Sequence, residues 1–204
     1  MPCNNQAYKI FLGLIWLSWV IYAFTFAPTQ QVADMAYIMQ MMRMETEQVD
    51  ASVIALFNLM GVWPMIMAAI LLIDGRGQKI PAWPFLLGSC VLGNFILFPY
   101  IILRKANPHF DGRKTIGVRV ADSKIFAMLI FLLANAMILL ALLMGNVEAF
   151  KTTFAVNNLV NIMTFDFILF LFAFPAILGD DMLRRGIDDR RQFWFHTLIP
   201  VLGP

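Results

Sequence analysis

The sequence has few charged residues. Asp, Glu, Lys and Arg make up only 14% of its 204 residues, whereas hydrophobic residues make up 60%. A soluble globular domain usually has about 25% charged and about 45–50% apolar residues. The mean hydropathy of +0.73 also departs from that class. The composition therefore excludes a water-soluble globule and predicts a single membrane domain over residues 1–204.

Residues that ligate metals are also rare. The two cysteines, Cys3 and Cys90, are too few for a disulfide framework or a four-thiolate metal site. The two histidines, His109 and His196, fall in connections, so a helical axial ligand for heme or chlorophyll is not expected. The net charge of only +2 gives no reason to expect a nucleic-acid partner. We predict no metal and no cofactor, and leave contacts with pigment or lipid open.

Long apolar runs, by contrast, are abundant. A helix needs about 20 predominantly apolar residues to cross a bilayer. Five runs of about this length are bounded by charges or turn residues, and they cover 10–26, 53–73, 80–103, 125–144 and 158–178. The sequence therefore predicts an all-α integral membrane protein with about five transmembrane helices, surrounded by a lipid bilayer.

Two further segments have helical features but cannot cross a membrane. Residues 30–47 alternate apolar and polar side chains at helical spacing, which predicts an amphipathic helix that lies on the membrane or caps the bundle. Residues 193–202 are apolar and aromatic, but the run is too short to span and contains Pro200. We expect a short interfacial or re-entrant C-terminal segment.

The distribution of basic residues predicts an orientation. With five spans, the connections on the N-terminal side carry four Lys and Arg residues and those on the opposite side carry eleven. Positively charged loops resist translocation. The prediction is an N-terminus outside or in the lumen and a C-terminus in the cytoplasm or stroma.

Asp166 is the one residue of Asp, Glu, Lys, Arg or His inside a predicted span. A charged carboxylate at the centre of a membrane helix costs about 2.5–3.5 kcal/mol on insertion scales, so it needs a partner. The expected partner lies on another helix, and the candidates are Asn58, Asn94 and Asn135. One interpretation is a proton or cation site. The other, which we favour, is a hydrogen-bonded carboxyl that holds two helices together.

Prolines and small residues mark other positions in the spans. Pro64, Pro99 and Pro175 each remove a backbone hydrogen bond, which predicts kinks and is also typical of the broken helices that line transporter sites. Ser89 and Gly93, with Gly88 beside them, form a pattern of small residues four apart. This pattern predicts a face where another helix packs closely.

The charged run at 179–191 contains paired aspartates and paired arginines. Enzymes that bind diphosphates through Mg²⁺ need carboxylates on two elements, and no second acidic element is present. Pairing at i and i+4 would instead join Asp180 to Arg184 and Asp181 to Arg185. We interpret the run as a solvated, salt-bridged helix end, and we predict no enzyme activity.

Several strings are distinctive: Phe57-Asn58-Leu59-Met60-Gly61-Val62-Trp63-Pro64, Ile80-Pro81-Ala82-Trp83-Pro84-Phe85, Pro99-Tyr100, Asp166-Phe167 with Phe174, and Asp181-Met182. They resemble a family of small multi-spanning membrane proteins of cyanobacteria and plant chloroplasts. The resemblance implies a location in the thylakoid or cyanobacterial inner membrane, and it implies no catalytic residues.

These observations lead to a ranked set of functions. The first is a non-enzymatic membrane protein that associates with, or assists assembly of, a photosynthetic complex of the thylakoid. The alternative is a small transporter or channel that uses Asp166 and the proline-broken helices. An enzyme that modifies lipid or pigment is a distant third.

Overall fold

Four long apolar helices form the body of the protein. The computed structural model describes residues 6–30, 33–76, 78–107 and 115–198, and this part of the chain contains ten helices and no strand. Four of the helices are long and apolar enough to cross a membrane: α1 (Gln6–Thr25), α3 (Ala51–Asp74), α7 (Lys124–Met144) and α9 (Asn158–Arg184). Each contains one of the predicted spans or nearly all of it, so the all-helical architecture is confirmed, with four helices that could span a membrane.

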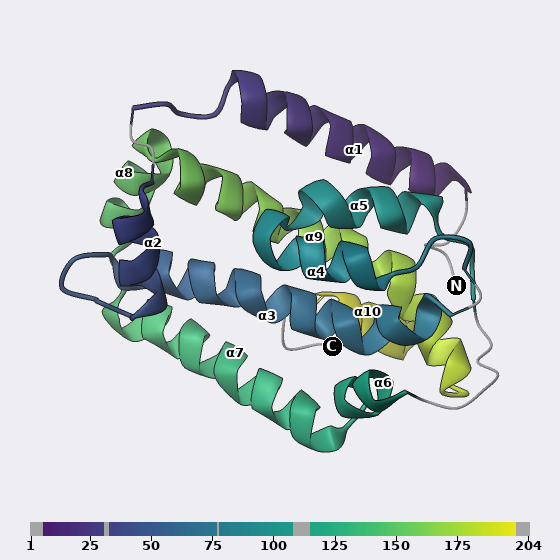
Figure 1. Cartoon of the computed structure of the whole chain (residues 1–204). Helices are drawn as coiled ribbons and strands as arrows, with labels where there is room; N and C mark the ends of the chain where they lie inside the picture. The colour runs from purple at the N-terminus through teal and green to yellow at the C-terminus, as the bar shows by residue number, and fades with distance from the viewer. Residues whose placement is uncertain (1–5, 31–32, 77, 108–114, 199–204) are drawn as a thin grey trace.

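The two central helices are α3 and α9. Half or more of the residues in their apolar 18-residue stretch are buried in the protein, against fewer than a fifth in α1 and α7, which lie on opposite flanks of the bundle (Figure 1). The Trp63 ring of α3 stacks on Phe170 of α9 with ring centroids 5.3 Å apart. Because α3 is apolar on all sides, it can pack against neighbours all around its axis.

The third predicted span, over 80–103, is not one helix. It consists of two ten-residue helices, α4 (Trp83–Leu92) and α5 (Asn94–Leu103), separated at Gly93. They lie side by side as a hairpin (Figure 1), and each is about 15 Å long at 1.5 Å per residue. This length reaches about halfway through a 30 Å hydrocarbon core. The predicted count of about five spans is therefore not confirmed.

Both ends of the hairpin lie at the same end of the bundle. A Cβ added to Gly75, just after α3, would lie 2.6 Å from Cβ of Ala82, just before α4. Arg104, just after α5, contacts Asp74, the last residue of α3. The chain thus enters and leaves this region on one side, as a re-entrant segment does.

Proline does not produce the break. Pro64, Pro99 and Pro175 lie inside α3, α5 and α9, and each helix continues through its proline. The break falls at Gly93, whose φ of 51° is left-handed and is strained for residues other than glycine.

The described residues at the two ends of the bundle differ in charge. The Asp74 end comprises the start of α1, the end of α3, both ends of the hairpin, α6 (Ile116–Ala121), the start of α7 and the end of α9 with the residues that follow it to Arg191. The opposite end, named here the Asp50 end, holds α2 (Met35–Met42) and α8 (Val147–Val156) (Figure 1). The Asp50 end carries Arg43 and Lys151, and the Asp74 end carries Lys9, Arg76, Lys79, Arg104, Lys105, Arg119, Lys124, Arg184, Arg185, Arg190 and Arg191.

This arrangement does not support the predicted orientation of the two termini. The amine of Lys9, near the start of α1, donates to the backbone oxygen of Arg104, which also pairs with Asp180 near the end of α9. The start of α1 and the end of α9 therefore lie at one end of the bundle, and they do not face opposite sides. The prediction counted the hairpin as a span, which places every later connection on the other side.

The short helices complete the two ends. The predicted amphipathic helix over 30–47 is shorter, since α2 has only eight residues, with Asp34 accepting a hydrogen bond from Tyr37 N at 2.8 Å. Met41 of α2 is fully buried against the start of α3, so α2 caps the bundle. At the other terminus, α10 (Arg190–Leu198) packs on α9 through the fully buried Phe193. Residues 199–202 of the predicted C-terminal segment lie outside the described residues.

Candidate functional site

The hairpin is held at its tip by Asp166. The backbone N–H of Asn94 donates to both carboxylate oxygens of Asp166, at 3.0 and 3.3 Å. In return the side-chain amide of Asn94 donates to the backbone oxygen of Asp166 at 2.9 Å. Both residues are buried. The partner of Asp166 therefore lies on another element, 72 residues away in the chain.

The position of Asn94 explains why the carboxylate is tolerated there. Asn94 is the first residue of α5, and the first N–H groups of a helix have no acceptor within the helix. The helix dipole also places a partial positive charge at this end. Asp166 thus acts as an N-terminal cap supplied by a different helix.

Gly93 is required by the same contact. A Cβ placed on Gly93 would lie 1.8 Å from Oδ2 of Asp166, closer than any packing allows. The structure therefore places Gly93 at a turn and not on a helix face. Of the other two predicted packing residues, Gly88 faces Ile96 across the hairpin, and the buried Ser89 donates to Leu86 O at 2.7 Å.

The other two candidate partners lie elsewhere. Asn58 donates to the backbone oxygen of Ile54 at 2.9 Å, one turn earlier in α3. Asn135 donates to Phe131 O at 2.8 Å, also within its own helix. Neither belongs to the Asp166 site.

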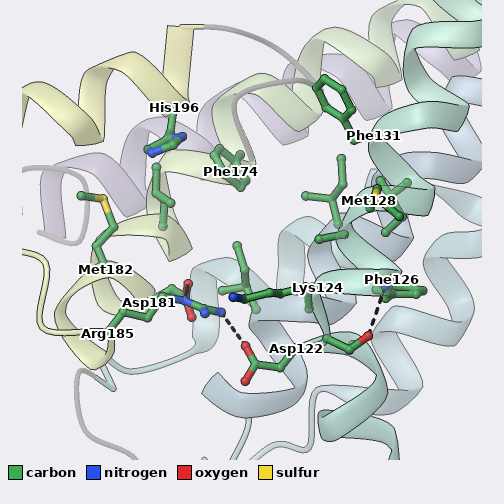
Figure 2. Close-up of a pocket in the computed structure, with 18 of the residues that line it drawn as sticks. Asp122, Lys124, Phe126, Met128, Phe131, Phe174, Asp181, Met182, Arg185 and His196 are labelled. Carbon is green, nitrogen blue, oxygen red and sulfur yellow. Dashed lines mark hydrogen bonds and ion pairs between the residues drawn. The ribbon is translucent and has the colours of Figure 1, made fainter.

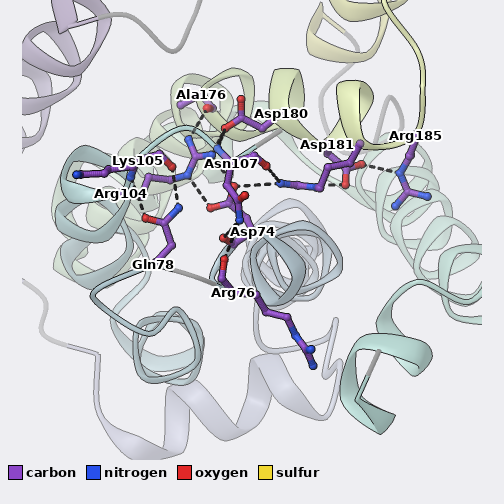
Figure 3. Close-up of polar contacts among 11 residues, drawn as sticks. Asp74, Arg76, Gln78, Arg104, Lys105, Asn107, Ala176, Asp180, Asp181 and Arg185 are labelled. Carbon is purple, nitrogen blue, oxygen red and sulfur yellow. Dashed lines mark hydrogen bonds and ion pairs between the residues drawn. The ribbon is translucent and has the colours of Figure 1, made fainter. Parts of the chain in front are cut away.

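The base of the hairpin is held by charges that the sequence analysis did not bring together. Arg104 donates from Nε and Nη2 to the two carboxylate oxygens of Asp74, at 2.7 and 2.6 Å. It also contacts Asp180 and donates from Nη1 to Ala176 O at 3.0 Å (Figure 3). The side chains of Arg104 and Asp74 are fully buried. This one guanidinium therefore joins the hairpin to both central helices.

The carboxylates keep Arg104 charged. Burial by itself lowers the pKa of Arg104, but the hydrogen bonds and charges of Asp74 and Asp180 outweigh it and raise the pKa above its usual value. A buried guanidinium without a partner would destabilise the fold. Paired with the two carboxylates, Arg104 instead forms a fixed contact.

Two more arginines complete the cluster. Arg184 lies 3.2 Å from Asp74 and 3.4 Å from Asp181, and Arg185 lies 2.7 Å from Asp181. The predicted pair of Asp181 with Arg185 is present, whereas Asp180 pairs with Arg104 and not with Arg184. Both aspartates are buried, so the helix end is not solvated as predicted.

Uncharged polar groups connect the two ends of the hairpin at its base. Asn107 donates from its side chain to the backbone oxygens of Asp74 and Arg76, both at 2.8 Å. Gln78 and Lys105 exchange two hydrogen bonds, at 2.7 and 2.9 Å, between the Gln78 amide and the Lys105 backbone (Figure 3). The segments that enter and leave the hairpin are thus tied directly to each other.

The contacts of this site among the described residues join the hairpin to α3 and α9. Among the described residues, no group of three His, Cys, Asp or Glu could hold a metal ion. Comparison of the chain with family models, curated proteins and solved structures finds no match. The resemblance to the cyanobacterial and chloroplast family therefore stays a prediction.

Proposed function

We propose that the protein is a non-enzymatic integral membrane protein that associates with a larger membrane complex or assists its assembly. The observation that supports this proposal most concerns Asp166, the one residue of Asp, Glu, Lys, Arg or His inside the predicted spans. Its carboxylate caps α5, so its first role is to fix the hairpin. The family resemblance is the reason to propose a photosynthetic complex.

We also propose an orientation. The described residues at the Asp74 end carry eleven Lys and Arg residues, and those at the Asp50 end carry two. By the positive-inside rule, the Asp74 end faces the cytoplasm, or the stroma in a chloroplast.

A small transporter or channel is the second candidate, and one observation favours it. Oδ1 of Asn94, at the hairpin tip, is buried and has no hydrogen-bond partner among the described residues. Helix ends that meet near the middle of a bilayer bind ions or substrates in several transporter folds. An ion or water held between Asp166 and Asn94 would satisfy this oxygen.

Asp166→Asn separates the two candidates. An amide keeps an oxygen that accepts from Asn94 N, but it cannot exchange a proton or neutralise a cation. For a structural carboxyl we expect the variant to accumulate and to complement a deletion strain almost fully.

The matched control is Asn135→Ala, which removes an intramembrane amide away from the hairpin. Native gels of gently solubilised membranes report whether the protein co-migrates with a complex. An Asp166→Asn protein that accumulates and co-migrates normally but fails to complement would favour the transporter.

A further inference from the structure

A cavity outside the hairpin opens near the Asp74 end. Its volume is about 570 Å³, within the range of small-molecule sites, and its walls come from α3, α7, α9 and α10. Figure 2 shows that the lining changes along its length. Asp122, Lys124 and Arg185 gather at one end, whereas most of the remaining lining is apolar, with Met128 and Phe131 among it and His196 on the side of Phe174.

The polar end has basic groups available for an anion. Lys124 forms no ion pair with any described residue. Arg185 uses Nε for Asp181 at 2.7 Å and Nη2 for Asp122 at 2.9 Å, so these contacts leave Nη1 for a further acceptor. In Figure 2 the amine of Lys124 points toward the guanidinium of Arg185. Asp181 and Asp122 compensate the charge of Arg185, so the amine of Lys124 is the cation at this end that has no ion-pair partner among the described residues, and it favours an anion beside it.

The start of α7 adds to this positive potential. Lys124 is the first residue of this 21-residue helix, and Ser123 caps it by accepting from Phe126 N at 3.1 Å. The remaining N–H groups of the first turn and the helix dipole favour an anion at this position.

The apolar end fits a hydrocarbon chain. Ile66 and Ile70 of α3, Ile130 and Phe131 of α7 and Phe174 of α9 line it. The cavity therefore runs from the basic end of the bundle into its apolar part, as a lipid does in one leaflet of a bilayer. Basic pockets between membrane helices are known sites for anionic lipid headgroups.

We propose that this cavity binds one anionic glycerophospholipid, with its phosphate held by Lys124 and Arg185 and an acyl chain packed against the aromatic residues of α7 and α9. The proposal does not depend on the function proposed above. It concerns a lipid bound as a ligand, in addition to the surrounding bilayer.

Native mass spectrometry of the purified full-length protein tests the proposal. Phosphatidylglycerol and phosphatidylcholine with identical acyl chains are added separately, and the lipid-bound fraction is measured. We expect phosphatidylglycerol to bind more tightly. Lys124→Gln should weaken that binding about fivefold, the effect of one basic group at a membrane surface. Lys79→Gln, an exposed lysine at the same end but outside the cavity, should change nothing.

A second variant tests the apolar part and does not involve charge. Ala127 lines the cavity, so Ala127→Phe should fill it and lower the binding of both lipids. Equal binding of the two lipids would overturn the proposal. A loss of phosphatidylglycerol binding in Lys79→Gln as large as that in Lys124→Gln would also overturn it. Competition by millimolar glycerol phosphate as strong as that by phosphatidylglycerol would assign the basic groups to a soluble phosphate, and it would likewise overturn the lipid proposal.

Discussion

The tip and the base of the hairpin are both held by buried carboxylates, but in different ways. At the tip, Asp166 accepts from a backbone N–H and forms no ion pair with a basic side chain of the described residues. At the base, Asp74, Asp180 and Asp181 contact three arginines. The tip lies deep in the apolar bundle, where a long basic side chain would be costly to bury. The base lies at the end of the helices, where the arginines can enter from the connections.

The difference shows how one short segment can be fixed at two depths. A backbone donor is always present at a helix start, so one carboxylate from α9 is enough to hold the tip. The base must connect three chain segments, and Arg104 does this because its guanidinium donates in several directions. The Asp166 contact at the tip and the Arg104 contacts at the base should therefore respond differently to substitution.

The largest effect is expected at the base. Arg104→Met leaves Asp74 and Asp180 buried without their shared cation. Removing one partner of a buried ion pair costs about 3–5 kcal/mol. We expect the variant not to accumulate in membranes, as measured by immunoblotting. Lys105→Gln is the control, because Lys105 is exposed and bonds Gln78 through its backbone. If Arg104→Met accumulates normally, the cluster does not hold the hairpin.

A somewhat smaller effect is expected at the turn. Gly93→Ala forces a Cβ into the Asp166 carboxylate and places alanine at a positive φ. Overpacking of this kind costs about 1–3 kcal/mol. Gly61→Ala is a matched control, since a Cβ on Gly61 meets nothing within 4 Å and alanine suits a helix interior. The comparison is made by thermal unfolding of the purified proteins, and equal melting temperatures would mean that the tip is packed loosely.

The smallest effect is expected at Asn94. Asn94→Ala removes the side-chain bond to Asp166 O but keeps the backbone N–H that caps the carboxylate. Intramembrane hydrogen bonds of this kind contribute about 0.6 kcal/mol. Thermal unfolding should therefore show only a small shift. A loss as large as that of Gly93→Ala would mean that the amide, and not the backbone, holds the tip.

Sequence reasoning succeeded where a helix is defined by its own residues. The predicted span over 125–144 agrees with α7 to within one residue, because an uncharged run bounded by Lys124 and Gly145 specifies both helix and length. It also identified Asp166 and included Asn94 among the three possible partners.

Sequence reasoning failed where contacts between distant parts of the chain determine the structure. The run at 80–103 is as apolar as a spanning helix, and its division depends on a turn that Asp166 stabilises from 72 residues away. The Gly93-Asn94 pair inside the run was a signal for a turn. Asp74 and Arg104 were treated as boundaries of spans, although opposite charges at neighbouring span ends were a signal for the ion pair that joins them.

Residues 83–103 form a re-entrant hairpin, and cysteine accessibility tests this arrangement most directly. In a background with Cys3→Ser and Cys90→Ser, single cysteines replace Lys79, Lys105 or Lys151, which are all exposed. A membrane-impermeant thiol reagent is applied to intact and to inverted membranes. We predict that Lys79→Cys and Lys105→Cys are labelled from the same face and Lys151→Cys from the other. Labelling of Lys79→Cys and Lys105→Cys from opposite faces would contradict the account, because the segment between them would then span the membrane.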